Sequence, residues 1–298
     1  MNRISTLVKT IRAPFLILTP ICVFLGVSIV LYQQNTIDIT SLILALLAAL
    51  FAHISVNMFN EYLDFKSGLD FQTQRTPFSG GSGALLQNPN MQVAVFYFAM
   101  LSLMITVLIG GYFIIKFGVG IMPMGLIGLF LVISYTNWIN KYPLLCIIAP
   151  GLGFSLFVVG TQYVLVGEYY NLTWLLALIP FFLVNNLLLL NQYPDIEADR
   201  QVGRNHFPIA FGIRLSNVIY GIFVLLTIIT IISLALLKIT PILSLIALLP
   251  LPLSLFSLFG ASKYGEAIGQ HTEYMASNVV VTLLVPLLLG VSLIVGVE

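Results

Sequence analysis

Long uninterrupted apolar runs restrict this chain to a helical architecture that spans a membrane. Residues 14–31 and 93–115 are two such runs without a charged side chain, and similar runs follow to the end of the sequence. About 20 apolar residues in a helix cross the hydrocarbon core of a bilayer, where a helix satisfies its own backbone polar groups. Only 8% of the residues are charged, against about 25% in soluble domains. The sequence therefore predicts an all-α membrane protein.

We predict about nine transmembrane helices around a central cavity, in a single domain that covers residues 1–298. The first run is too long for a secretory signal and has no convincing cleavage site, so we expect it to be a retained span. The net charge is only +1 and no basic patch is present, so nothing indicates a nucleic-acid partner. The expected spans are 14–31, 40–60, 93–115, 118–137, 144–166, 173–193, 217–237, 241–260 and 276–296.

The distribution of Lys and Arg residues predicts the orientation in the bilayer, because these residues are enriched in cytoplasmic loops. With the N-terminus in the cytoplasm, only Lys116 and Lys238 fall outside. We therefore expect a multi-pass protein of the cell membrane with a cytoplasmic N-terminus. The residues on the cytoplasmic side are then Arg3, Lys9, Arg12, Lys66, Arg75, Lys141, Arg200, Arg204, Arg214 and Lys263.

A stripe of polar residues follows the second span into the loop after it. Its five helical positions are spaced i, i+4, i+7, i+8 and i+11, which share one face. Polar side chains inside a span either mark a functional site or form hydrogen bonds between packed helices, and both interpretations stay open. The stripe consists of His53, Asn57, Asn60, Glu61 and Asp64, and Asp70 follows in the loop.

A second acidic stretch begins where a later apolar run ends. Asp195 and Asp199 are spaced i, i+4, Asn191 lies one turn earlier, and Pro194 is expected to kink or end the helix. Such oxygen ligands suit Mg²⁺, which typically binds one or two carboxylates together with substrate phosphates. Both clusters fall on the cytoplasmic side, so we expect them to face each other. Glu197 points off this face and is expected to be a surface charge.

The loop after the first cluster combines an arginine with several glycines. Residues 75–83 read Arg-Thr-Pro-Phe-Ser-Gly-Gly-Ser-Gly. Glycines let backbone N–H groups approach an anion, and arginine can hold a phosphate through two N–H groups. With Arg75 and Arg204 nearby, the two clusters would form a cradle for a magnesium diphosphate, and the apolar helices a slot for a hydrocarbon tail. A metal-bound diphosphate is a good leaving group, but these ligand types do not by themselves identify the reaction.

The two clusters resemble the two Asp-rich motifs of the UbiA superfamily of intramembrane prenyltransferases. The first reads Asn60-Glu61-Tyr-Leu-Asp64-Phe-Lys-Ser-Gly68-Leu-Asp70, and the second reads Asp195-x-x-x-Asp199 followed by Gly203-Arg204. The positions of Gly68 and Asp70 are similar to those in the branch that prenylates 1,4-dihydroxy-2-naphthoate in menaquinone synthesis. The resemblance implies Mg²⁺-dependent transfer of a polyprenyl group from its allylic diphosphate to an aromatic acceptor, on the cytoplasmic side of the membrane.

The same resemblance implies roles for individual residues. The catalytic residues would be Asn60, Asp64 and Asp195. The metal would be held by Asn60, Glu61, Asp64, Asp70, Asp195 and Asp199. The substrates would be contacted by Asn57, Arg75, Tyr135, Lys141, Asn191 and Arg204.

Two departures from the family pattern leave alternatives open. Glu61 stands where the family usually has Asp, and Gly203-Arg204-Asn205-His206 replaces a basic pair followed by Thr. The second departure bears on the acceptor, so 4-hydroxybenzoate, a porphyrin-type ring or a glycerol lipid stay open. A secondary transporter is the alternative from another class, although its site would lie near the middle of the bilayer. His206 is expected to be an ordinary loop residue.

Overall fold

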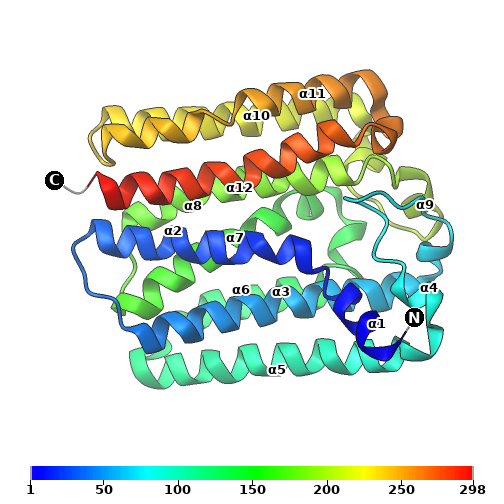
Figure 1. Cartoon of the computed structure of the whole chain (residues 1–298), viewed down its shortest axis with the longest axis horizontal. Coiled ribbons are helices and arrows are strands. Elements are labelled where there is room, and N and C mark those ends of the chain that lie inside the picture. The colour runs from blue at the N-terminus through cyan, green and yellow to red at the C-terminus, as the bar shows by residue number, and fades with distance from the viewer. Residues whose placement is uncertain (1, 297–298) are drawn as a thin grey trace.

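The computed structural model describes residues 2–296, and this range folds entirely into helices and turns (Figure 1). The α-helices are α1 (Arg3–Thr10), α2 (Leu18–Tyr32), α3 (Ile39–Ser67), α4 (Ala84–Gln87), α5 (Gln92–Phe117), α6 (Met122–Ser134), α7 (Pro143–Val166), α8 (Asn171–Asn191), α9 (Ile196–Gln201), α10 (Phe207–Leu236), α11 (Pro252–Tyr264) and α12 (Thr272–Val295). The 3₁₀ helices are η1 (Ala13–Ile17), η2 (Leu69–Phe71), η3 (Pro89–Met91), η4 (Val119–Ile121), η5 (Ile139–Lys141), η6 (Ile242–Leu248) and η7 (Gly265–Gln270).

The all-α membrane architecture is confirmed, but the count of nine full spans is not. Within residues 2–296, eight helical segments are long and apolar enough to cross a membrane. The span expected at 118–137 is instead the shorter apolar helix Val119–Ser134. It is short because Gly118, at φ 83°, ends α5 on one side and the turn at 135–138 ends the helix on the other.

The long helices run side by side, along the horizontal direction of Figure 1. Helix α3 packs along α5, α7 packs along α8, and α2 lies between α7 and α12. The largest apolar cluster joins α2, α7, α8 and α12, with Leu25, Val158, Ile179 and Val285 at its centre. Because the buried side chains of this cluster are close-packed, the helices that carry the polar residues are held in fixed positions.

Some polar residues inside the spans serve packing. Asn186 on α8 donates to the carbonyl of Tyr220 on α10 at 3.0 Å, and Asn278 on α12 donates to the carbonyl of Asn186 at 3.1 Å. The Tyr220 hydroxyl donates in turn to the Asn278 side chain at 2.8 Å. Such hydrogen bonds join helices that the apolar lipid does not drive together.

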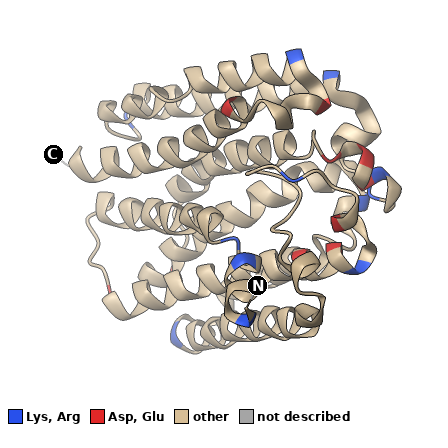
Figure 2. Ribbon diagram, turned by 45° about the vertical axis from the view of Figure 1, so that its right-hand side comes forward, with Lys and Arg blue, Asp and Glu red and all other residues tan. Residues whose placement is uncertain are grey.

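Most charged residues gather at one end of the bundle (Figure 2). Helix α3 ends at this end, where Gly68 adopts φ 84° and carries the chain into η2. At the other end, Lys116 pairs with Asp38, whose carboxylate also caps the start of α3. Both acidic clusters lie at the charged end, as expected. That this end faces the cytoplasm stays a prediction.

Candidate active site

The first acidic cluster is held by the last turns of α3 and the turn that follows. Asp64 is buried on the last turns of α3, and Asp70 is buried on η2. A left-handed residue is needed to reverse the chain between them, and Gly68 takes that conformation without steric strain. Both carboxylates therefore reach the same cavity.

The second cluster forms where α8 ends. Helix α8 stops at Asn191, a turn follows through Pro194, and Asp195 stands at the start of the short helix α9. The expected end of the helix near Pro194 is confirmed. Asn191, Asp195 and Asp199 all line the cavity opposite the first cluster.

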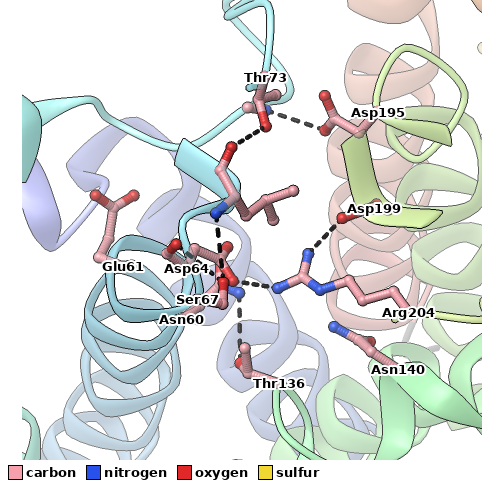
Figure 3. A network of polar contacts seen from close by, with 12 residues as sticks. Asn60, Glu61, Asp64, Ser67, Thr73, Thr136, Asn140, Asp195, Asp199 and Arg204 are labelled. Carbon is pink, nitrogen blue, oxygen red and sulfur yellow. Dashed lines mark hydrogen bonds and ion pairs between the residues drawn. The ribbon is translucent and has the colours of Figure 1, made fainter. Parts of the chain in front are cut away.

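Arg204 joins the two clusters (Figure 3). Its guanidinium pairs with Asp64 of α3 and, at 2.8 Å, with Asp199 of α9. Gly203, at φ 79°, turns the chain back so that the Arg204 N–H donates to the Asp199 carbonyl at 3.0 Å. The predicted phosphate contact is thus an ion-pair bridge in this structure, which brings the two halves of the chain together.

His206 extends this bridge. Its Nε2 lies 3.0 Å from the second carboxylate oxygen of Asp199, and the side chain is 2% exposed. His206 lies in a loop, as expected, and it is buried there because it directly precedes α10 and the turn at Gly203 places it beside Asp199.

Arg12 is a cavity residue that the sequence analysis counted only for membrane orientation. Its guanidinium pairs with Glu61 at 2.7 Å and donates to Asn60 Oδ1 at 3.0 Å. Both oxygens of Glu61 also accept from Ser82, through its N–H and its hydroxyl. Glu61 does not line the cavity, whereas Arg12 does, so Glu61 acts here as the anchor of Arg12 and of the glycine-containing loop.

That loop closes over the space between the clusters. The Gly80 N–H donates to Asp195 at 3.1 Å, so a residue before α4 contacts the start of α9. Gly81, at φ 70°, is packed so closely that a Cβ would stand 3.1 Å from the Asp70 carboxylate and 3.3 Å from the Arg12 guanidinium. A side chain at Gly81 would therefore crowd Asp70 and Arg12. That glycine N–H groups here approach a bound anion stays a prediction.

Two of the predicted substrate residues, Arg75 and Lys141, are exposed and do not line the cavity. Arg75 instead donates to the backbone carbonyl of Asp70 at 2.9 Å and supports the turn from outside. The other four predicted substrate residues line the cavity; they are Asn57, Tyr135, Asn191 and Arg204.

The cavity has a volume of about 600 Å³ and continues from the acidic mouth into the bundle. Along α3 it is lined from Asp64 to Ala45, a length of about 28 Å at 1.5 Å per residue. Beyond Asn57 its walls are mostly apolar, with glycines on α5, α6 and α7. His53 lies in this wall, hydrogen-bonded to Thr19 at 2.8 Å. The shape suits an amphiphile with an anionic head and a long apolar tail.

The mouth holds buried oxygens without hydrogen-bond partners. These are Oδ2 of Asp70, Oδ1 of Asp195 and Oδ1 of Asn191. Burial, followed by the neighbouring Glu61 and Asp64 carboxylates, raises the pKa of Asp70 to about 7. Burial, followed by the Asp199 carboxylate, raises the pKa of Asp195 to about 7. Unpaired buried oxygens of this kind fit a hard divalent cation.

Within residues 2–296, no group of three or more His, Cys, Asp or Glu side chains is close enough to hold a metal ion by itself. Mg²⁺ typically keeps several waters and binds through one or two carboxylates together with substrate phosphates. The two clusters face each other across a space that an anionic group would complete.

Comparison with known proteins agrees with this geometry. The model of the UbiA prenyltransferase family matches residues 19–294. Over 197 residues the chain is 29% identical to a 1,4-dihydroxy-2-naphthoate octaprenyltransferase of Bacillus subtilis (strain 168). That match covers 64% of this chain and 60% of the length of the relative.

Solved structures share the fold over almost the whole chain. A UbiA homolog from Archaeoglobus fulgidus, bound to DMAPP and Mg²⁺, has a TM-score of 0.68 at 15% identity, covering 97% of this chain and 99% of that one. A UbiA homolog from Aeropyrum pernix K1, without ligand, has a TM-score of 0.70 at 15% identity, covering 95% and 98%. The family match extends over both acidic clusters and over the long helices, except the start of the first and the last residue of α12, so this chain belongs to the UbiA prenyltransferase family.

Proposed function

We propose that this protein transfers a polyprenyl group from an allylic polyprenyl diphosphate to an aromatic acceptor, and that the acceptor is 1,4-dihydroxy-2-naphthoate. The observation that carries the reaction is the cavity, which joins an acidic and basic mouth to a long apolar slot. Support for the acceptor comes from the naphthoate octaprenyltransferase of Bacillus subtilis and from the position of Gly68 and Asp70 in the first motif.

In this proposal the two clusters bind the diphosphate through Mg²⁺. The carboxylates of Asp64, Asp70, Asp195 and Asp199 line the mouth, and the unpaired oxygens among them fit the cation. When bound, Mg²⁺ would neutralise the diphosphate and stabilise it as a leaving group. We omit Glu61 from the ligand set because Arg12 and Ser82 occupy its carboxylate.

The protein's own side chains would orient and activate the donor. Arg12 and Arg204 carry guanidinium N–H groups at the mouth, and charge-assisted bonds from them to phosphate oxygens would stabilise charge as it develops. The C–O bond to the diphosphate breaks with its electron pair on oxygen, and a ring carbon of the acceptor attacks the allylic carbon. That ring carbon then gives up the group it carried, as a proton or as CO₂ from a carboxylate, which restores the aromatic ring, and the diphosphate departs with the electron pair of the broken bond. The apolar slot excludes water, which would otherwise capture the allylic cation.

The location of the acidic residues favours an enzyme over a transporter. They lie at one end of the bundle (Figure 2), whereas transporters hold their substrate near the midplane between interrupted helices. We further propose that the charged end faces the cytoplasm, because it carries most of the Lys and Arg residues.

The proposal is tested with purified protein in liposomes and a radiolabelled polyprenyl diphosphate. We expect Mg²⁺-dependent product with 1,4-dihydroxy-2-naphthoate, loss of product in EDTA, and loss in Asp64→Asn and Asp195→Asn. Glu197→Gln is the matched control, since Glu197 is exposed and pairs only with its helix neighbours Arg200 and Gln201.

The acceptor panel separates the two levels of the proposal. Product with 4-hydroxybenzoate or a glycerol lipid, but not with the naphthoate, would overturn the acceptor and keep the reaction. No product with any acceptor from folded wild-type protein would overturn the reaction itself.

A further inference from the structure

Helix α1 presents two chemically different faces. On its inner face Thr6 and Thr10 are fully buried, and Leu7 and Ile11 pack against the apolar cluster formed by α3, α4 and α5. The helix is capped by Asn2, whose side chain accepts from the Ser5 N–H at 2.7 Å. It is therefore a docked, ordered element with one face fixed to the bundle.

The outer face is apolar in its middle and basic at its edges. Ile4 is 74% exposed and Val8 is 52% exposed, and their i, i+4 spacing puts them in one strip. Arg3 and Lys9 are exposed beside them. The sequence contains no Asp or Glu before Asp38, so no acidic residue in this segment offsets these charges. A short apolar strip with basic flanks is complementary to an anionic bilayer surface.

The position of α1 along the bundle is also consistent with a helix at the bilayer surface. The chain passes from α1 through Arg12 into the span Ala13–Tyr32, so α1 lies at a membrane boundary by connectivity. It contacts α3 and α4, and Asn88, just before α5, donates to Thr6 at 3.2 Å. In Figure 1, α1 lies against the side of the bundle near the charged end, where headgroups would surround it.

The same helix controls where Arg12 points. Arg12 is two residues beyond the end of α1 and adopts the left-handed region, with φ 55° and ψ 51°, a conformation that a non-glycine residue keeps only when its surroundings hold it. Asn57 of α3 fixes the preceding residue by donating to the Ile11 carbonyl at 2.9 Å. Movement of α1 away from the bundle would withdraw the Arg12 guanidinium from Asn60 and from the cavity mouth.

We propose that α1 is a lipid-binding helix. It lies in the headgroup layer of an anionic bilayer, with Ile4 and Val8 at the edge of the acyl chains and Arg3 and Lys9 at lipid phosphates. This docking holds Arg12 in the cavity mouth, so that anionic lipid strengthens binding of the diphosphate substrate. The second half of the proposal rests on the proposed function, and the first half does not.

A fluorescent label tests the docking without any activity measurement. Cys22 and Cys146 are buried, so the full-length Val8→Cys protein can be labelled at one site with an environment-sensitive dye. In nanodiscs containing phosphatidylglycerol, we expect lipids spin-labelled near the headgroup to quench the dye. We also expect the quenching constant for aqueous iodide to be at least threefold lower at position 8 than at position 197. Glu197→Cys is the control and stays open to iodide. Equal iodide quenching at both positions would overturn the proposal.

Charge reversal tests the link to the site. In Arg3→Glu/Lys9→Glu, neither residue belongs to the cavity, and we expect the protection at position 8 to be lost and the KM for the prenyl diphosphate to rise several-fold, with kcat less affected. Replacing phosphatidylglycerol by phosphatidylcholine should act on wild type in the same direction. An unchanged KM in both tests would overturn the link to Arg12. Wild type without transfer activity would count against the proposed function, while the quenching result would still decide the docking.

Discussion

Arg204, which follows α9, pairs with Asp64 on α3, a residue 140 positions earlier in the sequence. The same guanidinium also pairs with Asp199, so a single cation connects the two acidic clusters. Arg204 makes this connection at the mouth of the cavity.

Replacing Arg204 by Gln should impair donor binding. A charge-assisted hydrogen bond contributes about 1.5–3 kcal/mol, so we expect kcat/KM for the prenyl diphosphate to fall roughly 10- to 100-fold. Steady-state kinetics in liposomes measures this. Arg200→Gln is the control, because Arg200 is exposed and pairs only with Glu197. Wild-type kcat/KM in Arg204→Gln would contradict the role of Arg204 in the mouth.

Binding of Mg²⁺ should weaken as the pH falls below 7. The pKa values of Asp70 and Asp195 are raised to about 7, and a carboxyl must lose its proton before it binds a cation. Each protonated ligand would weaken the apparent affinity by up to about tenfold per pH unit. Measuring the Mg²⁺ concentration for half-maximal transfer at pH 6, 7 and 8 checks this. A constant value over that range would contradict it.

Without metal, the folded chain should become less stable as the pH rises, whereas the binding of Mg²⁺ becomes stronger. Both carboxyls have a usual value of 3.8 and titrate near 7 when folded, so between about pH 4 and 7 the folded chain holds more protons than the unfolded chain. The free energy of unfolding then falls as the pH rises through this window. In EDTA and detergent we expect a lower Tm at pH 7.5 than at pH 5, with Mg²⁺ recovering part of the difference at pH 7.5. Equal Tm values in EDTA would count against these shifted carboxyls.

Filling the apolar slot should limit the length of the donor. A Cβ at Gly110 would have no atom within 4 Å, and Gly110 lines the part of the cavity far from Asp64. We expect Gly110→Phe to lose transfer from long polyprenyl diphosphates while keeping transfer from short ones, since only the far end is blocked. Gly110→Ala adds little volume and serves as the control. Product analysis with a series of donor lengths measures the effect, and equal loss for all lengths would contradict it.

Gly151 should be intolerant of a side chain for reasons of packing alone. A Cβ there would clash with the Phe181 carbonyl on α8, and the Gly151 N–H donates to the Asn185 side chain at 2.7 Å. We expect Gly151→Ala to destabilise the protein by about 1–3 kcal/mol, seen as a lower Tm in detergent. Gly153→Ala, on the same helix with no atom within 4 Å of the added carbon, should leave the Tm almost unchanged. Similar Tm values for the two variants would contradict the close approach of α7 and α8.

The sequence predicted most of the fold because apolar runs and polar interruptions are local signals. The polar stripe ending at Asp64 and the cluster after α8 both stand at helix ends, and their position at one end of the bundle followed from the span count. The count itself is not confirmed at Val119–Ser134, where hydropathy could not show that Gly118 and a turn bound a shorter helix.

Side-chain direction within loops could not be read from the sequence. Arg75 looked like a phosphate ligand because of its glycine-rich neighbours, yet it does not line the cavity, and its guanidinium donates to the Asp70 carbonyl. Arg12 had no motif around it, and no residue pattern in the sequence indicates that its backbone adopts the left-handed conformation. His206 reached Asp199 only through the turn at Gly203. The positions of Arg12 and His206 thus depend on a backbone reversal rather than on residue type.

The shortness of helix α6 has a consequence for the lipid around it. Its neighbours α5 and α7 contain 26 and 24 residues, while α6 contains 13, and its outer side chains, such as Ile127, Phe130 and Ile133, are exposed to the surroundings. A short apolar helix beside longer ones is matched by local thinning of the bilayer. We therefore expect the bilayer to be thinner next to α6, so that a change in membrane thickness would act on this wall of the cavity.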